Sequence, residues 1–275
     1  FRSEEKKATQ EEIKIGGKTI SARFAPLMDK DNQIWGVVVL LQDITQTRKL
    51  EHLRKEFISN VSHELRTPLS YLQGFTEAIL DGVIQEPEEK EKYLNIILEE
   101  TLRLRRLVNE LLDLSQMESG NFTLKKEKIS LNNLIERVVK KAGPYAAKKQ
   151  IKINYQLQDI PLVMADEDRI QQVLINLIDN AIKHTGYGNE ILVHSKSYAE
   201  GVAVSVKDHG PGIPEDEIDF IWERFYKVDK SRARDKGGTG LGLAIVKNII
   251  NAHGGKVEAR NCPEGGIEFS FYLPL

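Results

Sequence analysis

Apolar residues alternate with polar ones at Ile13 and Ile15 and again from Ile20 to Phe24, on either side of the turn signal Gly16-Gly17. A period of two is typical of half-buried β-strands. A polar turn then precedes the apolar run Ile34–Leu41, so residues 1–44 are predicted to form an antiparallel meander. A meander of this length buries little core by itself. Because the chain also starts at Phe1 within a charged run, we expect the meander to complete a larger domain that begins upstream.

Apolar residues recur at steps of three or four over residues 45–119, which predicts two long helices. On the second helix the steps alternate between four and three, as in the seam of a coiled coil. Asp81-Gly82 and Glu86-Pro87 separate the two helices. Two such helices bury only part of their apolar surface against each other, so a four-helix bundle made by two chains is expected. The alternative is a hairpin that packs against the third part of its own chain.

Residues 120–275 mix the two patterns, which predicts a layered α/β sandwich with glycine-rich loops. The whole chain is therefore predicted to be a multidomain α+β protein, with boundaries after residues 44 and 119. Within the third part, strands are predicted at 151–157, 191–197, 202–206 and 269–273, and helices at 129–142, 168–184 and 241–253.

Composition narrows the class of protein. Hydrophobic residues make up 40% of the 275 and charged residues 29%, which excludes a wholly disordered chain. With 39 basic and 41 acidic residues, nothing indicates a nucleic-acid coat. The longest apolar run is Ile34–Leu41, far short of the roughly 20 residues of a membrane-spanning helix, and no signal peptide is recognised. Cys262 is the only cysteine, so no intrachain disulfide forms, which fits a reducing compartment.

The first candidate for chemistry is His63, on the first long helix. It lies about 200° around the helix from the apolar stripe and should face solvent. Glu64 is adjacent and could orient or deprotonate the imidazole, and Thr67 shares its face one turn later. Pro68 removes a helical hydrogen bond, so a local kink is expected there. The group suits nucleophilic chemistry; the alternative is a plain surface histidine beside an accidental proline.

A second group, Asn176, Asn180 and Lys183, falls on one face of a predicted helix. Amide oxygens are hard ligands that suit Mg²⁺, and a lysine one turn on suits phosphate oxygens. The alternative is an ordinary polar stripe on an amphipathic helix. Asparagine has a low helix propensity, which favours the functional interpretation.

Two glycine-rich loops complete the set. Asp208 ends a predicted strand before Gly210 and Gly212, where its carboxylate could accept a hydrogen bond from an exocyclic amine. The segment 237–243 leads into an apolar helix and could bind an anion, although it is not a Walker A loop. The alternatives are a tight turn and a mobile basic loop. Residues 223–227, between the two loops, are expected to form a short helix or lid segment.

In this order, the five motifs resemble the H, N, G1, F and G2 boxes of the sensor histidine kinases of two-component signalling, over about residues 50–275. The segment that ends in Gln42-Asp43-Ile44-Thr45 resembles the last strands of a PAS sensory domain. The H box and the stretch 223–229 are similar to those of Gram-positive sensor kinases, in particular the respiration-regulating kinases of bacilli. The resemblance implies a PAS-like segment at 1–44, a dimerisation and phosphotransfer hairpin at 45–119, and an ATP-binding domain of the Bergerat type at 120–275.

The resemblance also implies residue roles. His63 would accept the γ-phosphate of ATP, Glu64 would act as the general base, and Thr67 would position water when the bundle acts as a phosphatase. Asn180 would coordinate Mg²⁺ with Asn176. The remaining nucleotide-binding residues would be Lys183, Asp208, Gly210, Gly212, Arg224, Phe225, Gly238, Thr239, Gly240, Leu241 and Gly242.

The implied cofactors are ATP and Mg²⁺, and the implied partners are a second copy of the chain and the receiver domain of a response regulator, without nucleic acid. The chain would be the cytoplasmic region of a membrane-anchored sensor, tethered only through an upstream segment. Ser119-Gly120-Asn121 is the expected hinge.

Two other functions stay open. One is a nucleotide-binding scaffold without transfer, although His63 and Asn180 are both present. The other is an ATP-driven conformational ATPase. Asn176 argues against it, because it stands where gyrase-like ATPases carry a water-activating glutamate.

Overall fold

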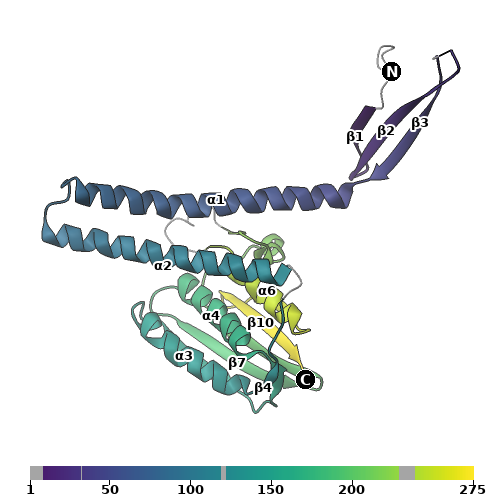
Figure 1. Cartoon of the computed structure of the whole chain (residues 1–275). Coiled ribbons are helices and arrows are strands. Elements are labelled where there is room, and N and C mark those ends of the chain that lie inside the picture. Colours follow the sequence, from purple (N-terminus) through teal and green to yellow (C-terminus); the bar gives the residue numbers. More distant parts are fainter. Residues whose placement is uncertain (1–8, 32, 119–121, 229–238) are drawn as a thin grey trace. The chain divides into compact units, whose positions relative to one another are not determined.

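The computed structural model describes residues 9–31, 33–118, 122–228 and 239–275. The chain divides into two compact units, residues 1–66 and 67–275 (Figure 1). The predicted hinge at 119–121 lies outside the described residues.

The first unit begins with the predicted meander. Its three strands pair in the order β1-β2-β3, antiparallel throughout, which confirms the prediction. Both residues of the Gly16-Gly17 turn have positive φ, which explains the choice of glycine at the reversal. Ala22 is buried, whereas most of β3 is exposed. The strands are β1 Thr9–Ile15, β2 Lys18–Met28 and β3 Ile34–Asp43.

Two long helices follow, as predicted: α1 Thr45–Leu80, which continues through Pro68 and into the second unit, and α2 Pro87–Glu118. In the second unit the rings of Phe75 on α1 and Tyr93 on α2 lie 5.0 Å apart, which ties the end of one helix to the start of the other. Across the described part of the chain, no helix combines the length and apolarity needed to cross a membrane.

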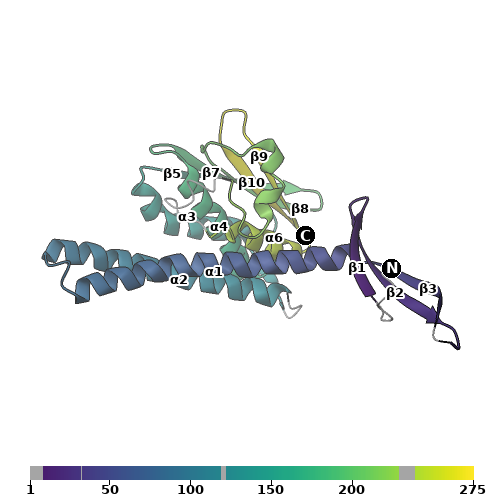
Figure 2. The same cartoon turned by 90° about the horizontal axis from the view of Figure 1, so that it is seen from above.

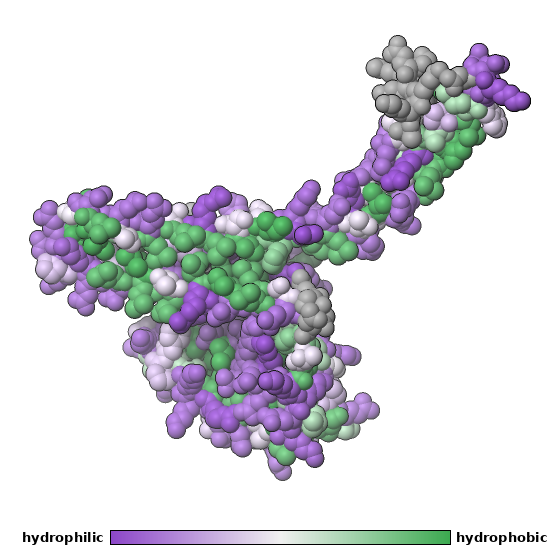
Figure 3. Space-filling view, in the orientation of Figure 1, coloured by the Kyte–Doolittle hydropathy of each residue, from purple (hydrophilic) through white to green (hydrophobic). Residues whose placement is uncertain are grey.

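Apolar side chains lie exposed along α2 in the single chain, and Figure 3 shows them gathered over the helix. They are Leu94, Leu98, Leu102, Val108 and Leu112.

The rest of the second unit is a five-stranded sheet covered by helices on one face, which confirms the α/β sandwich (Figure 2). The strand order is β5-β7-β8-β10-β9, with β5 and β7 parallel and the other neighbours antiparallel. The strands are β5 Lys152–Leu157, β7 Glu190–Tyr198, β8 Gly201–Lys207, β9 Lys256–Asn261 and β10 Ile267–Pro274, and the helices are α3 Leu131–Ala147, α4 Glu167–His184 and α6 Gly242–Ala252.

Side chains that are buried at every second position of the strands build the core of this sandwich. Alternate residues of β10, from Ile267 to Leu273, are buried, while their neighbours face the open side of the sheet. Helix α4 supplies the opposing layer. Its buried residues are Ile170, Val173, Leu174, Leu177, Ile178, Ala181 and Ile182.

The structure differs from the prediction in two respects. Helix α3 begins at Leu131, after the N-cap Ser130, and runs through Pro144 to Ala147, whereas a helix over residues 129–142 was predicted. Strand β9 and four short elements were not predicted; each of the short elements spans only three residues, which is too few to show a period. The short elements are β4 Glu127–Ile129, β6 Val163–Ala165 and the 3-10 turns η1 Glu215–Glu217 and η2 Phe220–Trp222.

Candidate functional site

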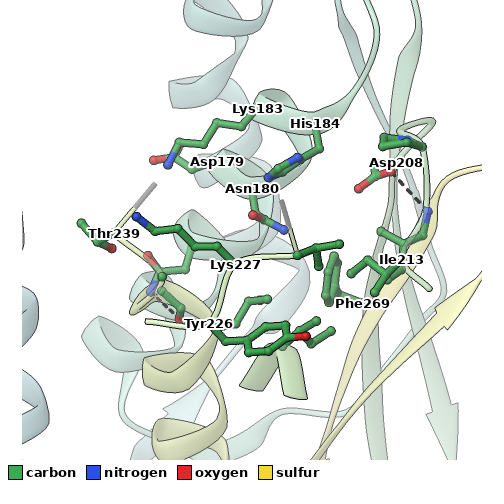
Figure 4. Close-up of a pocket in the computed structure, with 18 of the residues that line it drawn as sticks. Asp179, Asn180, Lys183, His184, Asp208, Ile213, Tyr226, Lys227, Thr239 and Phe269 are labelled. Atoms are coloured by element: carbon green, nitrogen blue, oxygen red, sulfur yellow. Dashed lines mark hydrogen bonds between the residues drawn. The ribbon is translucent and has the colours of Figure 1, made fainter. Parts of the chain in front are cut away.

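The polar face of α4 forms one wall of a cavity of about 260 Å³ (Figure 4). The N-cap Asp166 starts this helix by accepting the N–H of Arg169, and the apolar stripe then fixes which face turns to the core. Asn176, Asn180 and Lys183 consequently line the cavity together, and so does Asp179, which the sequence analysis passed over.

Asp208, directly after β8, marks one end of the cavity. Its side chain is 1% exposed, and Oδ1 accepts the N–H groups of Gly210 (2.8 Å) and Ile267 (3.2 Å). Oδ2 is buried and has no hydrogen-bond partner among the described residues. Burial raises the pKa of this carboxyl, and the two N–H bonds act in the opposite direction. A buried acceptor left open beside a cavity fits a ligand that brings its own donor.

The G1 turn holds Asp208 in place. A side chain at Gly210 would bring Cβ to 2.9 Å from the carbonyl oxygen of His184, so only glycine lets this turn approach α4 so closely. The loop is also tied to β9, because the side chain of Asn261 accepts the N–H of Ile213 and donates to its carbonyl.

Apolar side chains from several elements line the same cavity, which suits a flat, largely apolar ring. These side chains are Ile213, Ile221, Leu243, Ile267 and Phe269. No local motif marked Ile221, Ile267 and Phe269, because each belongs to an ordinary core pattern.

The opposite end of the cavity is formed by Lys183 and Thr239 (Figure 4). Burial lowers the pKa of Lys183, while nearby Asp179 raises it. Thr239 is buried and its hydroxyl accepts the N–H of Leu241, at the start of α6. Gly238 lies outside the described residues.

Gly240 connects the F and G2 segments. It has a φ of +75°, and a Cβ there would lie 2.8 Å from the backbone of Phe225. Its carbonyl accepts the N–H of Phe225, which itself has a φ of +59°, an uncommon conformation for a bulky residue. This contact joins the two ends of the segment 226–239.

The predicted nucleotide residues therefore fall into two groups. Eight described ones line the cavity itself: Asn176, Asn180, Lys183, Asp208, Gly212, Thr239, Gly240 and Gly242. Four do not line it: Gly210, Arg224, Phe225 and Leu241. Gly210 acts on Asp208, Phe225 pairs with Gly240, and Leu241 is a buried residue whose N–H binds Thr239.

Asn176 also makes a structural contact. Its side-chain nitrogen donates to the carbonyl of Gly242 at 3.4 Å, which links α4 to the first residue of α6. A role toward a metal ion would therefore fall to its amide oxygen. No group of three His, Cys, Asp or Glu side chains that could hold a metal is present in the described ranges.

Two residues of α2, Arg106 and Glu110, also line the cavity, and the sequence analysis did not single them out. Glu110 accepts a hydrogen bond from the Thr239 hydroxyl at 2.7 Å. A heptad pattern identifies the apolar positions of a helix and gives no sign of which polar residue will meet a distant loop.

The H-box residues lie on α1. His63 is exposed, as helix geometry predicts, and Glu64 is half-buried. Both belong to the first unit, whereas exposed Thr67 and buried Pro68 begin the second. Helix α1 is continuous across all four.

Comparison with known families gives one match over the two long helices and another over most of the sandwich. Residues 53–120 match the His Kinase A (phospho-acceptor) domain, and residues 165–275 match the histidine kinase-, DNA gyrase B-, and HSP90-like ATPase family.

Individual relatives agree with these matches. The sensor protein SrrB of Staphylococcus aureus is 41% identical over 250 residues, which cover 87% of this chain and 41% of SrrB. The chain therefore spans less than half the length of this relative. Histidine kinase ThkA, solved in complex with response regulator protein TrrA, has a TM-score of 0.66 and 32% identity, over 97% of this chain and 78% of ThkA. ShkA, solved in complex with AMPPNP, has a TM-score of 0.59 and 29% identity, over 80% of this chain and 45% of ShkA.

Proposed function

The chain belongs to the sensor histidine kinases of two-component systems, and we propose that it transfers the γ-phosphate of ATP to His63 and then to an aspartate of a response regulator. The observation that carries the proposal is Oδ2 of Asp208, which has no hydrogen-bond partner in the described part of the chain and lies at the end of the cavity opposite Lys183 and Thr239. The exocyclic amine of adenine would donate to this oxygen, and the phosphates would extend toward the lysine and the start of α6. The ATPase-family match and the ShkA complex with AMPPNP support a nucleotide as the ligand.

The transfer assigns a role to each H-box residue. An imidazole nitrogen of His63 attacks the γ-phosphorus, the bond from that phosphorus to the β–γ bridging oxygen breaks, and ADP leaves. Glu64 takes the proton that the imidazole loses. Thr67, one turn later, positions water for hydrolysis of the regulator's phospho-aspartate. The exposure of His63 supports this assignment, because the nucleophile must be reached by two different partners.

The donor set at the phosphate end fits Mg²⁺. Asn180 and the amide oxygen of Asn176 are hard ligands, and phosphate oxygens would complete the coordination. A bound Mg²⁺ would neutralise charge on the phosphates. Lys183 would bind a phosphate, Gly212, Gly240 and Gly242 would allow close backbone approach, and Gly210, Arg224, Phe225 and Leu241 would support the site from outside the cavity.

The exposed apolar residues of α2 support a homodimer that buries them in a four-helix bundle. The antiparallel sheet of the first unit is consistent with the end of a PAS-like sensory domain. We further propose that the chain is the cytoplasmic region of a membrane-anchored sensor related to the respiration-regulating kinases of bacilli.

The test is incubation of the wild type and His63→Gln with γ-labelled ATP and Mg²⁺. Label that is acid-labile, alkali-stable and absent from the variant is the expected result, and transfer to a receiver domain should then discharge it. Steady release of phosphate without labelled protein would instead indicate an ATPase. Tight nucleotide binding with neither labelling nor hydrolysis would indicate a scaffold.

A further inference from the structure

Helix α2 reaches into the nucleotide cavity through Glu110. The carboxylate of this half-buried residue accepts a 2.7 Å hydrogen bond from the hydroxyl of Thr239. That hydroxyl also accepts the N–H of Leu241, which precedes the first residue of α6. Glu110 therefore holds the hydroxyl of Thr239, and the phosphates of a nucleotide would lie next to this hydroxyl.

The charge of Glu110 opposes that use of the site. Burial raises the pKa of Glu110, whereas its hydrogen bond from Thr239 and the cations Lys183 and Arg106 favour the ionised form. Both cations line the same cavity and would attract phosphates. A phosphate chain would compete with the carboxylate for these cations and for the Thr239 hydroxyl, and the two anions would repel each other. Glu110 and a phosphate chain are thus rivals for one set of partners.

A second contact between α2 and the sandwich lies outside the cavity. Asp113, one turn after Glu110, accepts hydrogen bonds from Arg169 (2.9 Å) and Gln172 (2.7 Å) on α4. None of these three residues lines the cavity. Helix α2 therefore contacts the ATP-binding sandwich both at a place that a nucleotide would meet and at a place that it would not.

We propose that Glu110 is a latch that the phosphates of the nucleotide must open, so that nucleotide loading and docking of α2 on the sandwich oppose each other. The inference rests on the proposed function only in taking the ligand to be a nucleoside triphosphate. Coupling between two binding events is reciprocal. Weakening the latch must therefore tighten triphosphate binding, and binding a triphosphate must loosen α2.

The first experiment measures binding of adenosine and of a non-hydrolysable ATP analogue with Mg²⁺ to the full chain by calorimetry. Glu110→Gln keeps the size of the side chain and removes its charge. It should tighten the analogue about fivefold or more, the lower end of ordinary allosteric coupling. Adenosine, which lacks phosphates, should bind as it does to the wild type.

Gln172→Leu is the matched control, because it removes a hydrogen bond of the second contact without changing a charge near Glu110. It weakens docking without changing the cavity lining, so it should tighten the analogue in the wild-type background and add nothing once Glu110 is replaced. Equal tightening by Gln172→Leu in both backgrounds would overturn the proposal, because the coupling would then bypass Glu110. Analogue binding that is unchanged or weaker in Glu110→Gln would overturn it directly.

Amide hydrogen exchange of the wild type gives a readout that needs no variant. Exchange in α2 around residues 107–114 should accelerate when the analogue is added and stay constant with adenosine; slower exchange with the analogue would refute the latch. The outcome is separable from the proposed function. Failure to label His63 while the analogue binds would remove the transfer, whereas normal labelling with unaltered affinity in Glu110→Gln would remove only the latch.

Discussion

Replacing Asp208 by Asn separates the stability of the ATP-binding sandwich from its use of the base. Asparagine keeps the oxygen that accepts the N–H groups of Gly210 and Ile267, so the turn should persist. Burial raises the pKa of the native carboxyl, so the folded state holds its proton more tightly than the unfolded state does. Stability from this group is therefore lost as the pH rises above the unfolded-state pKa. At neutral pH, Asp208→Asn should leave the melting temperature of the nucleotide-free protein unchanged or higher.

The same substitution should weaken ATP binding. The asparagine NH₂ group takes the place of the unpartnered Oδ2, so a donor faces the donor amine of adenine. Loss of a hydrogen bond to a charged group costs about 1.5–3 kcal/mol, which corresponds to roughly a 10- to 150-fold rise in Kd. Inosine triphosphate carries a carbonyl oxygen in place of the amine. Asp208→Asn should therefore bind it better than the wild type does.

The assay is calorimetric titration of the wild type and Asp208→Asn with a non-hydrolysable ATP analogue and with inosine triphosphate. The ratio of the two Kd values gives the preference of each protein for adenine. Thermal unfolding without nucleotide controls for damage to the fold. In Asp208→Asn, the preference for the ATP analogue over inosine triphosphate should be smaller than in the wild type, or reversed. An equal loss of affinity for both nucleotides, or a variant that still prefers adenine by the wild-type factor, would show that Oδ2 does not meet the base.

Other positions test the fold, the contact between Gly240 and Phe225, and the proposed dimer. Burial lowers the pKa of His253 below its ordinary 6.5, and the Nε2 atom of this histidine accepts the N–H of Asp166. Urea unfolding at several values between about pH 5 and 8 should therefore show the free energy of unfolding falling as the pH drops through the unfolded-state pKa of the histidine. The pH dependence should be flatter in His253→Gln. Gly240→Ala forces a positive φ on alanine at about 1–2 kcal/mol and a clash with Phe225, so scanning calorimetry should show a lower melting temperature, and an unchanged one would contradict the described contact. Leu98→Glu places a charge on the exposed apolar face of α2. Sedimentation should then show monomers, with the helix content retained. A variant that remains dimeric would show that the dimer interface does not include this face.

Sequence periodicity accounts for most of the architecture. The meander, the two long helices and the sandwich all follow from periods of two or three to four residues, since each is long enough to repeat its pattern. Three-residue β4 and β6 are too short to do so. Helix α3 passes through Pro144 although proline disfavours a helix interior; it continues for only three more residues, to Ala147, and Ala146 is buried there.

The candidate site follows the same rule: residues that are neighbours in sequence could be predicted, whereas contacts between distant segments could not. The chemistry of Asp208 could be predicted from a strand end followed by glycines, because all of these residues are neighbours in sequence. Its open oxygen could not, because that depends on the N–H of Ile267, which lies on β10. Glu110 is the extreme case. Its bond to Thr239 spans 129 positions, and no local pattern on either segment indicates it.

The two ends of the cavity differ in what holds them. At the base end, Asp208 is oriented by backbone N–H groups within one packed sheet, so the cost of ordering it is met when the sandwich folds. At the phosphate end, Thr239 is held by the side chain of Glu110, which belongs to helix α2. Affinity for the base should therefore be constant, while affinity for phosphates should vary with the position of α2. The ratio of ATP to adenosine affinity, rather than either affinity alone, is then the quantity that reports whether α2 is docked.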